Sequence, residues 1–444
     1  MGDLEKVVGW IEGHRDEAIG FLADLVKIPS VNPWFSNYNP YTTEKTVQFF
    51  LADALRDMGF DVELWDVDAE ALKPYAGMPG YYEGRLMKDR PNLRAVSRGT
   101  GGGRSLLLTG HPDVVKEGEG WSRDPFGAQI ENGRMYGRGT VDMKGGIAAM
   151  IMAVKAILES GVRLKGDVIV GTTPDEEAGG MGALDFVHRP GFSADGAIMT
   201  EPTYSRGIGS MCRGILWGKI VIPARAGHIE MEQQDWRQGG AVDGVKLAQL
   251  YLAQIDQFNT RWAARKKHPL LPMPCQLTVA QVVAGEYPSA YAGFAEISFD
   301  AQYLPEDLDE KYRGSRIKKE IEDFVAAVAK TDEWLRENPP HVEWLLDADC
   351  AETPADGVFV QTLLGAANKL SGEVEIVGLG GHSDMGWFAR AGIPIVNFGP
   401  GDPMLAHQAD ESIAIDDYLN CTKILASMIL DWCGSAEEGG GDGR

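Results

Sequence analysis

Four short apolar segments constrain the fold of this chain more than any other feature of its sequence. They lie at 105–109, 167–173, 196–200 and 393–398, and each is centred on a run of Val, Ile, Leu, Ala, Met or Phe. Such runs are typical of strands that are buried on both faces of a largely parallel sheet. Because parallel strands need crossover helices, we also predict a helix over 145–159, between the first two strands. The chain is therefore predicted to contain an α/β domain.

A second pattern interrupts this α/β domain. The segment 209–348 is predicted to run strand, helix, strand, strand, helix, strand, which is the order of a ferredoxin-like α+β unit. We therefore predict a domain formed by 1–208 and 349–444, with 209–348 inserted as a smaller domain. Within the small domain the predicted elements are 216–223, 241–258, 276–283, 295–303, 310–329 and 341–346. In the large domain we also predict helical structure from the start of the chain to Pro29, over 43–58 and over 358–370.

Composition excludes several classes of partner. The 444 residues carry 42 Lys and Arg against 65 Asp and Glu, a net charge of −23 that repels nucleic acid and anionic membrane surfaces. The longest central apolar stretch, 147–154, is much shorter than the ~18–20 residues that a spanning helix needs. The acidic start lacks the features of a signal peptide, so we expect a cytoplasmic protein. The tail over 437–444 is predicted to be disordered.

Cysteine usage agrees with a reducing compartment. The five cysteines are an odd number, and no two of them form a C-x-x-C pair. Neither a disulfide framework nor a thiolate zinc site is therefore indicated. We expect reduced thiols that are mostly buried.

Each of the four predicted parallel strands is followed by polar residues that can bind a metal or move a proton. Ligands of open α/β sheets bind at the carboxyl ends of the strands, so these loops are expected to meet in space. A glycine-rich turn over 137–146 adds one more carboxylate before a helix. In chain order the residues are His111, Asp113, Asp142, Asp175, Glu176, Glu177, Glu201 and His407.

Two imidazoles with several carboxylates suit a pair of divalent ions, with zinc expected first and cobalt or manganese as substitutes. One carboxylate must then bridge the two ions. Two ions about 3.5–4 Å apart can clamp a hydroxide and polarise a carbonyl, the two tasks of amide hydrolysis. Asp113, two residues after His111, fits a carboxylate that orients the ring of a ligand. Of the adjacent Glu176 and Glu177, one can ligate while the other takes the proton of the water.

The chain resembles the dimetal peptidase and deacylase family that contains acetylornithine deacetylase, succinyl-diaminopimelate desuccinylase, aminoacylase and glutamate carboxypeptidase. The order and spacing of the matching segments agree over nearly the whole chain. These segments are Gly110–Val115, Gly137–Gly146, Asp175–Glu177, Glu201–Pro202, and Phe398–Gly401 leading to His407 and Glu411.

The resemblance implies a role for each residue of the site. His111 and Glu201 would bind one metal ion, and Glu177 and His407 the other. Asp142 would bridge the two ions, and Glu176 falls on the general base of the family. The resemblance further implies a zinc-peptidase-like catalytic domain whose inserted domain serves as a lid and usually as the dimer interface. His228 then corresponds to a lid histidine that reaches the active site of a partner subunit and stabilises the oxyanion.

Departures from the family pattern concern the substrate. Relatives that hold a substrate carboxylate commonly read Asp-x-Arg-x-x-Pro in a lid strand, whereas this chain has Gln302 at the arginine position. His382 and Asp384 lie in a segment, Gly381–Asp384, where the family usually reads Gly-Thr-Asp, and Ser289–Ala292 replaces an Asn-Val-Val-Pro type of turn. We therefore expect altered pocket chemistry, unless a nearby cation replaces the missing one. The candidates for that cation are Arg213 and Arg225.

Together these observations predict a dimetal hydrolase that cleaves an amide-type C–N bond of a small molecule, as an N-acyl amino acid deacylase or a small peptidase. A rival within the same fold is hydrolysis of an unusual C–N bond on an aromatic amine or amide, which Gln302 and the lid aromatics favour. A rival of another class is a silent relative that only binds metal and ligand. The presence of Glu176 argues against it, because a lost base would be its simplest signature.

Overall fold

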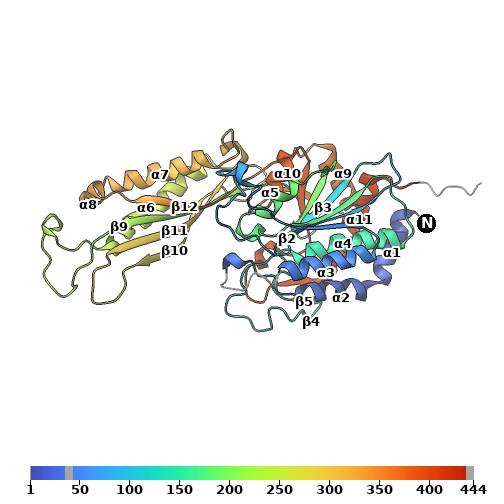
Figure 1. The fold of residues 1–444 in the computed structure, drawn as a ribbon, viewed down its shortest axis with the longest axis horizontal. Coiled ribbons are helices and arrows are strands. Elements are labelled where there is room, and N and C mark those ends of the chain that lie inside the picture. Colours follow the sequence, from blue (N-terminus) through green and yellow to red (C-terminus); the bar gives the residue numbers. More distant parts are fainter. Residues whose placement is uncertain (1, 36–43, 437–444) are drawn as a thin grey trace, which may run out of the picture. The chain divides into compact units, whose positions relative to one another are not determined.

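A computed structural model describes residues 2–35 and 44–436 of the chain (Figure 1). The predicted disordered tail over 437–444 lies outside the described residues. The chain forms two compact units. The large unit runs to Cys212 and continues over 351–379 and from Ser383, and the small unit comprises 213–350 with 380–382.

The large unit is built on an eight-stranded, mostly parallel sheet with the order β1-β2-β6-β3-β7-β14-β8-β13. β3 pairs in parallel with both β6 and β7, and β7 pairs in parallel with β14, so the four predicted strands are neighbours in the sheet. β1 and β2 add an antiparallel edge. The bounds are β1 Asp61–Asp66, β2 Pro91–Ser97, β3 Leu106–Gly110, β6 Val168–Thr172, β7 Ala197–Pro202, β8 Gly207–Cys212, β13 Glu375–Leu379 and β14 Ile395–Gly399.

Helices cover both faces of this sheet. A Cβ on Gly110 of β3 would meet Ile147 of α4, whereas a Cβ on Gly171 of β6 would meet Phe186 of α5. Gly110 lies beside Thr172 in the register, and successive residues of a strand point to opposite faces, so α4 and α5 lie on opposite sides. The helices are α1 Asp3–Gly13, α2 Arg15–Val26, α3 Glu44–Asp57, α4 Lys144–Glu159, α5 Met181–His188, α9 Val358–Asn368, α10 Met385–Arg390 and α11 Ile415–Cys433.

The core of the large unit surrounds α4. This helix is apolar on nearly all sides because it lies against β3 and β7 and also packs on α1, α2 and α11. The helical stretch predicted before Pro29 is in fact two helices, α1 and α2, which meet at His14 where the backbone leaves the helical region. A separate sheet of β4 Gln129–Glu131, β5 Arg134–Tyr136 and β15 Ser412–Ala414 holds the glycine-rich turn over 137–146 beside Glu411.

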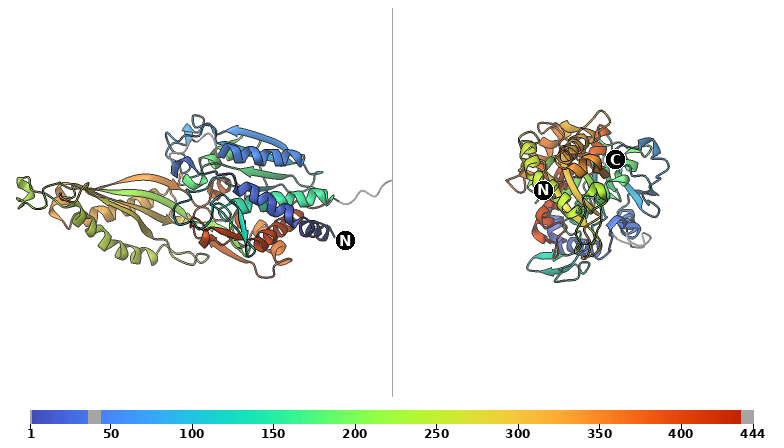
Figure 2. Two further views of the ribbon diagram at one scale, coloured as in Figure 1. Left: turned by 90° about the horizontal axis from the view of Figure 1, so that it is seen from below. Right: turned by 90° about the vertical axis from the view of Figure 1, so that its left-hand side faces the viewer.

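The small unit has the predicted β-α-β-β-α-β order and an antiparallel sheet ordered β10-β11-β9-β12. β9 alternates buried and partly exposed residues along its length, as a strand with one covered face requires. The helices form the second layer of this unit (Figures 1 and 2). The bounds are β9 Gly214–Pro223, α6 Gly244–Ala263, β10 Leu277–Ala284, β11 Phe294–Tyr303, α7 Ser315–Ala329, α8 Glu333–Glu337 and β12 His341–Ala348.

Two boundaries differ from the prediction. The segment 207–212 forms β8 of the large sheet, so the first part of the large unit extends beyond the predicted end at 208. Residues 380–382 return to the small unit, which the sequence did not indicate. All five cysteines are free and buried, as expected. Within the described residues, no helix combines the length and the apolar character that crossing a bilayer requires.

Candidate metal centre

The predicted metal ligands all lie in the large unit, four of them at or beyond the carboxyl ends of strands and one in a turn before a helix. His111 directly follows β3, and Glu201 lies near the end of β7. Glu177 belongs to a short 3-10 helix, η3 Glu176–Ala178, just after β6. His407 follows β14, and Asp142 lies in the turn that leads into α4. The parallel strands therefore bring these loops together, as predicted.

Two clusters of donor atoms share one carboxylate. In the first, His111 Nε2 lies 3.2 Å from Asp142 Oδ1 and 3.5 Å from Glu201 Oε1. In the second, His407 Nε2 lies 3.2 Å from Asp142 Oδ2 and 3.2 Å from Glu177 Oε2. The donor atoms within each cluster are all within 4.8 Å of one another, close enough to hold one ion. The two oxygens of Asp142 thus face different clusters, which is the arrangement that a bridging ligand needs.

Glu176 approaches the first cluster without belonging to either. Its Oε2 lies 3.6 Å from His111 Nε2. The side chain is buried, and this burial raises the pKa of Glu176 well above its usual value. A carboxylate with a raised pKa is a stronger base, which is the property required of a group that accepts a proton near neutral pH.

The electrostatics of the clusters favour positive charge. Burial raises the pKa of Glu201 to about 7. Burial also opposes ionisation of Asp142, but hydrogen bonds with His111 and His407 outweigh it and hold the pKa of this carboxyl below its usual value. The carboxylate of Glu177, with Asp142 beside it, raises the pKa of His407. The carboxylates stabilise a cation at these positions, whether it is a proton or a metal ion.

Asp113 orients His111 through its backbone rather than its side chain. His111 Nδ1 lies 2.9 Å from the Asp113 carbonyl oxygen, whereas the nearest carboxylate oxygen is 3.6 Å away. The predicted carboxylate contact is therefore replaced by a carbonyl contact, which directs Nε2 toward the first cluster. The carboxylate of Asp113 instead accepts hydrogen bonds from the backbone N–H groups of Glu176 and Glu177.

Arg138 and Glu411 support Asp142 and were not predicted to do so. Glu411 Oε1 accepts hydrogen bonds from the backbone N–H groups of Val141, at 2.8 Å, and of Asp142, at 3.3 Å. Its other oxygen forms a buried ion pair with Arg138. Arg138 lies in the glycine-rich turn over 137–146, and Glu411 follows His407 in the last matching segment of the sequence. Their places in these segments were the only sequence signal for this supporting role. The peptide bond between Asp142 and Met143 is cis.

The predicted substrate residues are divided between the units. Asp384 lies in the large unit, buried at the start of α10, whereas the others lie in the small unit. Arg213 donates to Gln302 Oε1 at 2.7 Å, so a cation does lie beside position 302. Arg225 instead donates to the Trp236 carbonyl at 2.7 Å.

Two histidines of the small unit complete the set of predicted residues. His228 is exposed, and its backbone pairs with Ala290 in an isolated bridge. His382 Nδ1 lies 3.0 Å from the Asp349 carbonyl oxygen. Both histidines are thus placed within the small unit.

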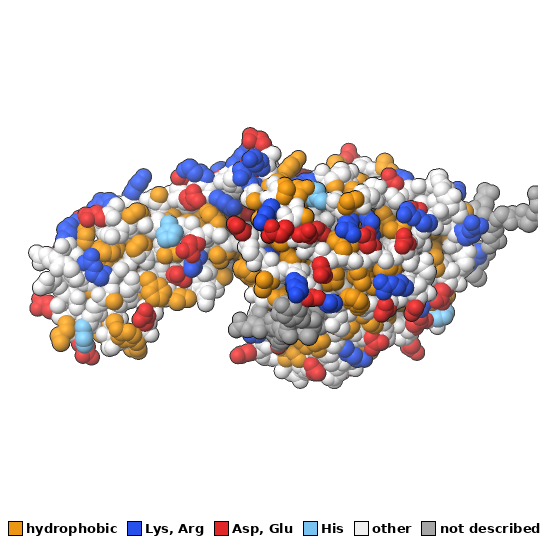
Figure 3. Space-filling view, in the orientation of Figure 1, with side chains coloured by type: hydrophobic (Ala, Val, Ile, Leu, Met, Phe, Trp, Pro, Cys, Tyr) orange, Lys and Arg blue, Asp and Glu red, His pale blue; other side chains and the backbone are white. Residues whose placement is uncertain are grey.

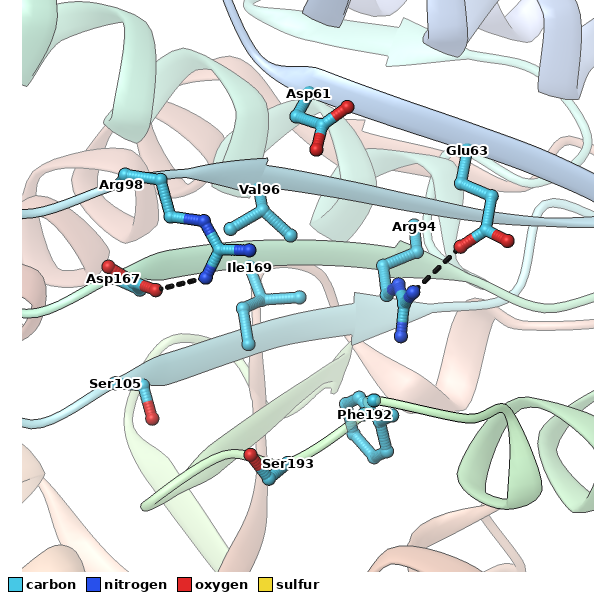
Figure 4. A pocket seen from close by; sticks show the side chains of 11 residues that line it. Asp61, Glu63, Arg94, Val96, Arg98, Ser105, Asp167, Ile169, Phe192 and Ser193 are labelled. Carbon is cyan, nitrogen blue, oxygen red and sulfur yellow. Dashed lines mark hydrogen bonds and ion pairs between the residues drawn. The ribbon is translucent and has the colours of Figure 1, made fainter.

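A cavity of the large unit lies at the opposite ends of the same strands (Figure 4). Ser105 and Asp167, which line it, precede β3 and β6, whereas the predicted ligands His111 and Glu177 follow these strands. Its arginines are paired, Arg98 with Asp167 at 2.7 Å and Arg94 with Glu63 at 2.7 Å (Figure 4). This cavity is therefore separate from the candidate metal centre.

An α/β sheet that carries two imidazole and carboxylate clusters at the carboxyl ends of its strands is typical of a metal-dependent hydrolase. The chain belongs to peptidase family M20/M25/M40, whose model matches residues 107–431. As predicted, it is a metallohydrolase that acts on C–N bonds.

Individual relatives cover nearly the whole chain. It is 29% identical to an N-formyl-4-amino-5-aminomethyl-2-methylpyrimidine deformylase of Bacillus subtilis, over 96% of this chain and 97% of the relative. It is 28% identical to a succinyl-diaminopimelate desuccinylase of Methylobacterium radiotolerans, over 93% of this chain and 96% of the relative. The fold is similar to that of the di-peptidase Dug1p from Saccharomyces cerevisiae, with a TM-score of 0.76, 16% identity, and coverage of 98% of this chain and 100% of that chain.

Proposed function

We propose that this protein is a dimetal amidohydrolase that removes a small acyl group from an amine. The observation that carries the proposal is the position of Asp142, whose two oxygens each lie 3.2 Å from Nε2 of a different imidazole. His111 and Glu201 would hold one ion, and Glu177 and His407 would hold the other. Asp142 would bind both ions.

The donor set fits two zinc ions, with cobalt or manganese as substitutes. It offers nitrogen and oxygen atoms and no thiolate, which suits divalent ions of borderline softness. Three carboxylates, those of Asp142, Glu177 and Glu201, would offset most of the positive charge of two divalent ions. When bound, such a pair activates a water molecule and polarises the scissile carbonyl.

Glu176 moves the proton during hydrolysis. Its buried carboxylate, whose pKa is raised, accepts a proton as the water oxygen bonds to the carbonyl carbon. As the C–N bond breaks, Glu176 passes this proton to the leaving amine nitrogen, and the acyl group departs as a carboxylic acid. Its distance of 3.6 Å from His111 Nε2 supports this role, because the base must stand beside the water without being a ligand.

His228 of a second copy of the chain would stabilise the negative charge that develops on the carbonyl oxygen. The small unit is proposed as the dimer interface. Edge strand β10 carries the exposed residues Val282 and Val283, and Tyr287 beyond its end is also exposed. Figure 3 shows hydrophobic side chains at the surface of the small unit. Light scattering should give twice the mass of one chain, and a monomer would contradict this part of the proposal.

For the substrate we propose a small N-acyl amine whose amine side is aromatic and lacks a carboxylate. Gln302 supports this choice because it cannot supply the charge of the arginine that it replaces. The deformylase relative is named for a formylated aminomethylpyrimidine, a compound of this kind. His382 and Asp384 are proposed as further contacts to the amine side.

The five free cysteines agree with a cytoplasmic location.

A second candidate is an N-acyl amino acid or a small peptide. The contact of 2.7 Å between Arg213 and Gln302 favours it, because Arg213 places a cation next to the position of the missing arginine. A substrate carboxylate could then compete with Gln302 for the guanidinium group. Arg225 is less suited, because it binds the Trp236 carbonyl and lies over the Trp334 ring.

A substrate panel tests the proposal and separates the two candidates. Zinc-loaded and cobalt-loaded protein is assayed with N-formyl and N-acetyl arylmethylamines, N-acyl amino acids and dipeptides. We expect the highest kcat/KM for an N-acyl arylmethylamine. A preference for N-acyl amino acids or dipeptides would favour the second candidate, and inactivity on every amide would contradict the assignment as an amidohydrolase.

A further inference from the structure

A buried network of charged side chains lies beneath the turn that carries Glu176. At its centre is Asp175, which is fully buried and has a φ of 76°, in the left-handed region. Its Oδ1 accepts hydrogen bonds from Arg90 at 2.9 Å, Arg85 at 3.2 Å and Asn32 at 3.3 Å. Three donors on one carboxylate oxygen fix the residue that directly precedes the proposed base.

The two arginines are held in place by groups from other parts of the large unit. Arg90 forms a second buried ion pair with Glu44, the first residue of α3, and both side chains are almost completely buried. The Arg85 guanidinium lies over the ring of Trp34, 4.5 Å from its centroid, and over the ring of Tyr82, 4.7 Å from its centroid. Each arginine therefore reaches Asp175 from a fixed position.

The same groups hold the turn beyond Asp175. Arg85 Nη2 donates to the Ala178 carbonyl at 2.9 Å, and the Tyr82 hydroxyl donates to the Gly179 carbonyl at 3.3 Å. A Cβ on Gly179 would lie 2.3 Å from the Tyr82 hydroxyl oxygen, so the ring packs directly on this turn. The turn from Asp175 to Gly179 is thus clamped at both ends.

The network also reaches the first metal cluster. Asn32 Nδ2 donates to Asp113 Oδ2 at 2.8 Å as well as to Asp175. Asp113 in turn accepts the backbone N–H groups of Glu176 and Glu177, and its carbonyl binds His111. One continuous set of hydrogen bonds therefore connects the turn of the base to a metal ligand on the neighbouring strand.

We propose that Asp175, clamped by Arg85 and Arg90, is a positioning residue that sets the carboxylate of Glu176 at its working distance from the first cluster. This inference rests on the proposed role of Glu176 as the general base. A buried charge network costs desolvation that an apolar turn would avoid, so its presence here needs a reason other than stability. Precise placement supplies that reason, because a displacement of about 1 Å in a reacting group can lower a rate by about 10²-fold.

The test compares Asp175→Asn, Arg85→Met and Arg85→Lys with wild type. Asp175→Asn should lower kcat by about 10- to 100-fold with little change in KM or in bound zinc, because bound zinc would still hold its proposed ligand Glu177, whereas Glu176 is not a ligand and depends on the turn for its position. Arg85→Lys should retain more activity than Arg85→Met, since it keeps a positive charge toward Asp175. Arg98→Met is the matched control, because it removes the ion pair with Asp167 at the other end of β6 and should leave kcat unchanged.

A double-mutant cycle separates positioning from a general structural role. In a Glu176→Gln background, Asp175→Asn and Arg85→Met should cost little further activity, because there is no longer a base to place. An equal loss in both backgrounds, or loss of zinc, would overturn the inference. If Glu176→Gln lowers kcat but the network variants do not, the inference fails while the proposed function stands. If Asp175→Asn does not fold, Arg85→Met and Arg85→Lys test the inference instead, because Arg85 is a hydrogen-bond donor to Asp175. Their kcat values are then compared in the wild-type and Glu176→Gln backgrounds.

Discussion

Glu411 and Arg138 form a buried ion pair directly behind Asp142. Through its other oxygen Glu411 binds the backbone N–H of Asp142 at 3.3 Å, so the ion pair sets the position of the carboxylate that faces both imidazoles. Groups that orient a metal ligand in this way typically contribute about 10- to 100-fold to metal affinity.

Glu411→Gln should therefore weaken zinc binding by about 10- to 100-fold while the protein remains folded. Competition with a chelator of known affinity measures the change, and circular dichroism checks the fold. The neighbouring Asp410→Asn serves as the control, because Asp410 binds exposed Ser122 and should not affect zinc affinity. Equal affinity for wild type and Glu411→Gln would show that this ion pair does not support the centre.

Glu176 and Glu177 should respond differently to the same substitution. Glu176→Gln is expected to keep its zinc and to lose about 10²- to 10⁴-fold in kcat, the usual contribution of a general base. Glu177→Gln is expected to lose zinc, because its Oε2 lies 3.2 Å from His407 Nε2 in the second cluster. Metal analysis and steady-state kinetics on both variants check this, and the opposite pattern would exchange the two roles.

Position 302 tests the substrate assignment. An arginine at position 302 would face the positive charge of Arg213, so Gln302→Glu is the more informative change. The new carboxylate would form an ion pair with Arg213, and Arg213 could then no longer bind the carboxylate of a substrate. For an aromatic, carboxylate-poor substrate, kcat/KM should change by less than about threefold, whereas residual activity on N-acyl amino acids should fall by about tenfold, or ~1.4 kcal/mol. Gln302→Met is the control, because it removes the amide group of Gln302 without adding a negative charge. If the ranking of substrates does not change, position 302 does not face the substrate.

Metal binding should depend on pH because the clusters hold protons when no ion is bound. Glu177 and Asp142 raise the pKa of His407, so in metal-free protein near neutral pH this imidazole carries a proton that an ion must displace. Zinc affinity should then rise as pH rises, by about tenfold per pH unit for each proton released. Calorimetry in buffers of different ionisation enthalpy measures the protons directly. An affinity that is constant between pH 6 and 8 would contradict this account.

Much of this architecture follows from local sequence patterns. β3, β6, β7 and β14 could be predicted because strands buried on both faces must be apolar throughout. β8 was not predicted, because Gly-Ile-Gly-Ser-Met-Cys has no strand pattern of its own and depends on pairing with neighbouring strands.

The candidate site divides in a similar way. Four of the proposed metal ligands could be located because they lie at or beyond the carboxyl ends of apolar strands. Their supports could not, because Arg90 and Glu44 meet Asp175 only after distant segments fold together. Nor does the sequence show that the backbone of Asp113, rather than its carboxylate, orients His111.

The central claim is that two ions share Asp142, and metal analysis of wild type and Asp142→Ala tests it most directly. Wild-type protein loaded with zinc and freed of excess should hold close to two ions per chain and lose activity to a chelator. Asp142→Ala should hold fewer than one, because both clusters lose an oxygen donor that lies 3.2 Å from an imidazole nitrogen. A variant that keeps the wild-type stoichiometry would contradict the account.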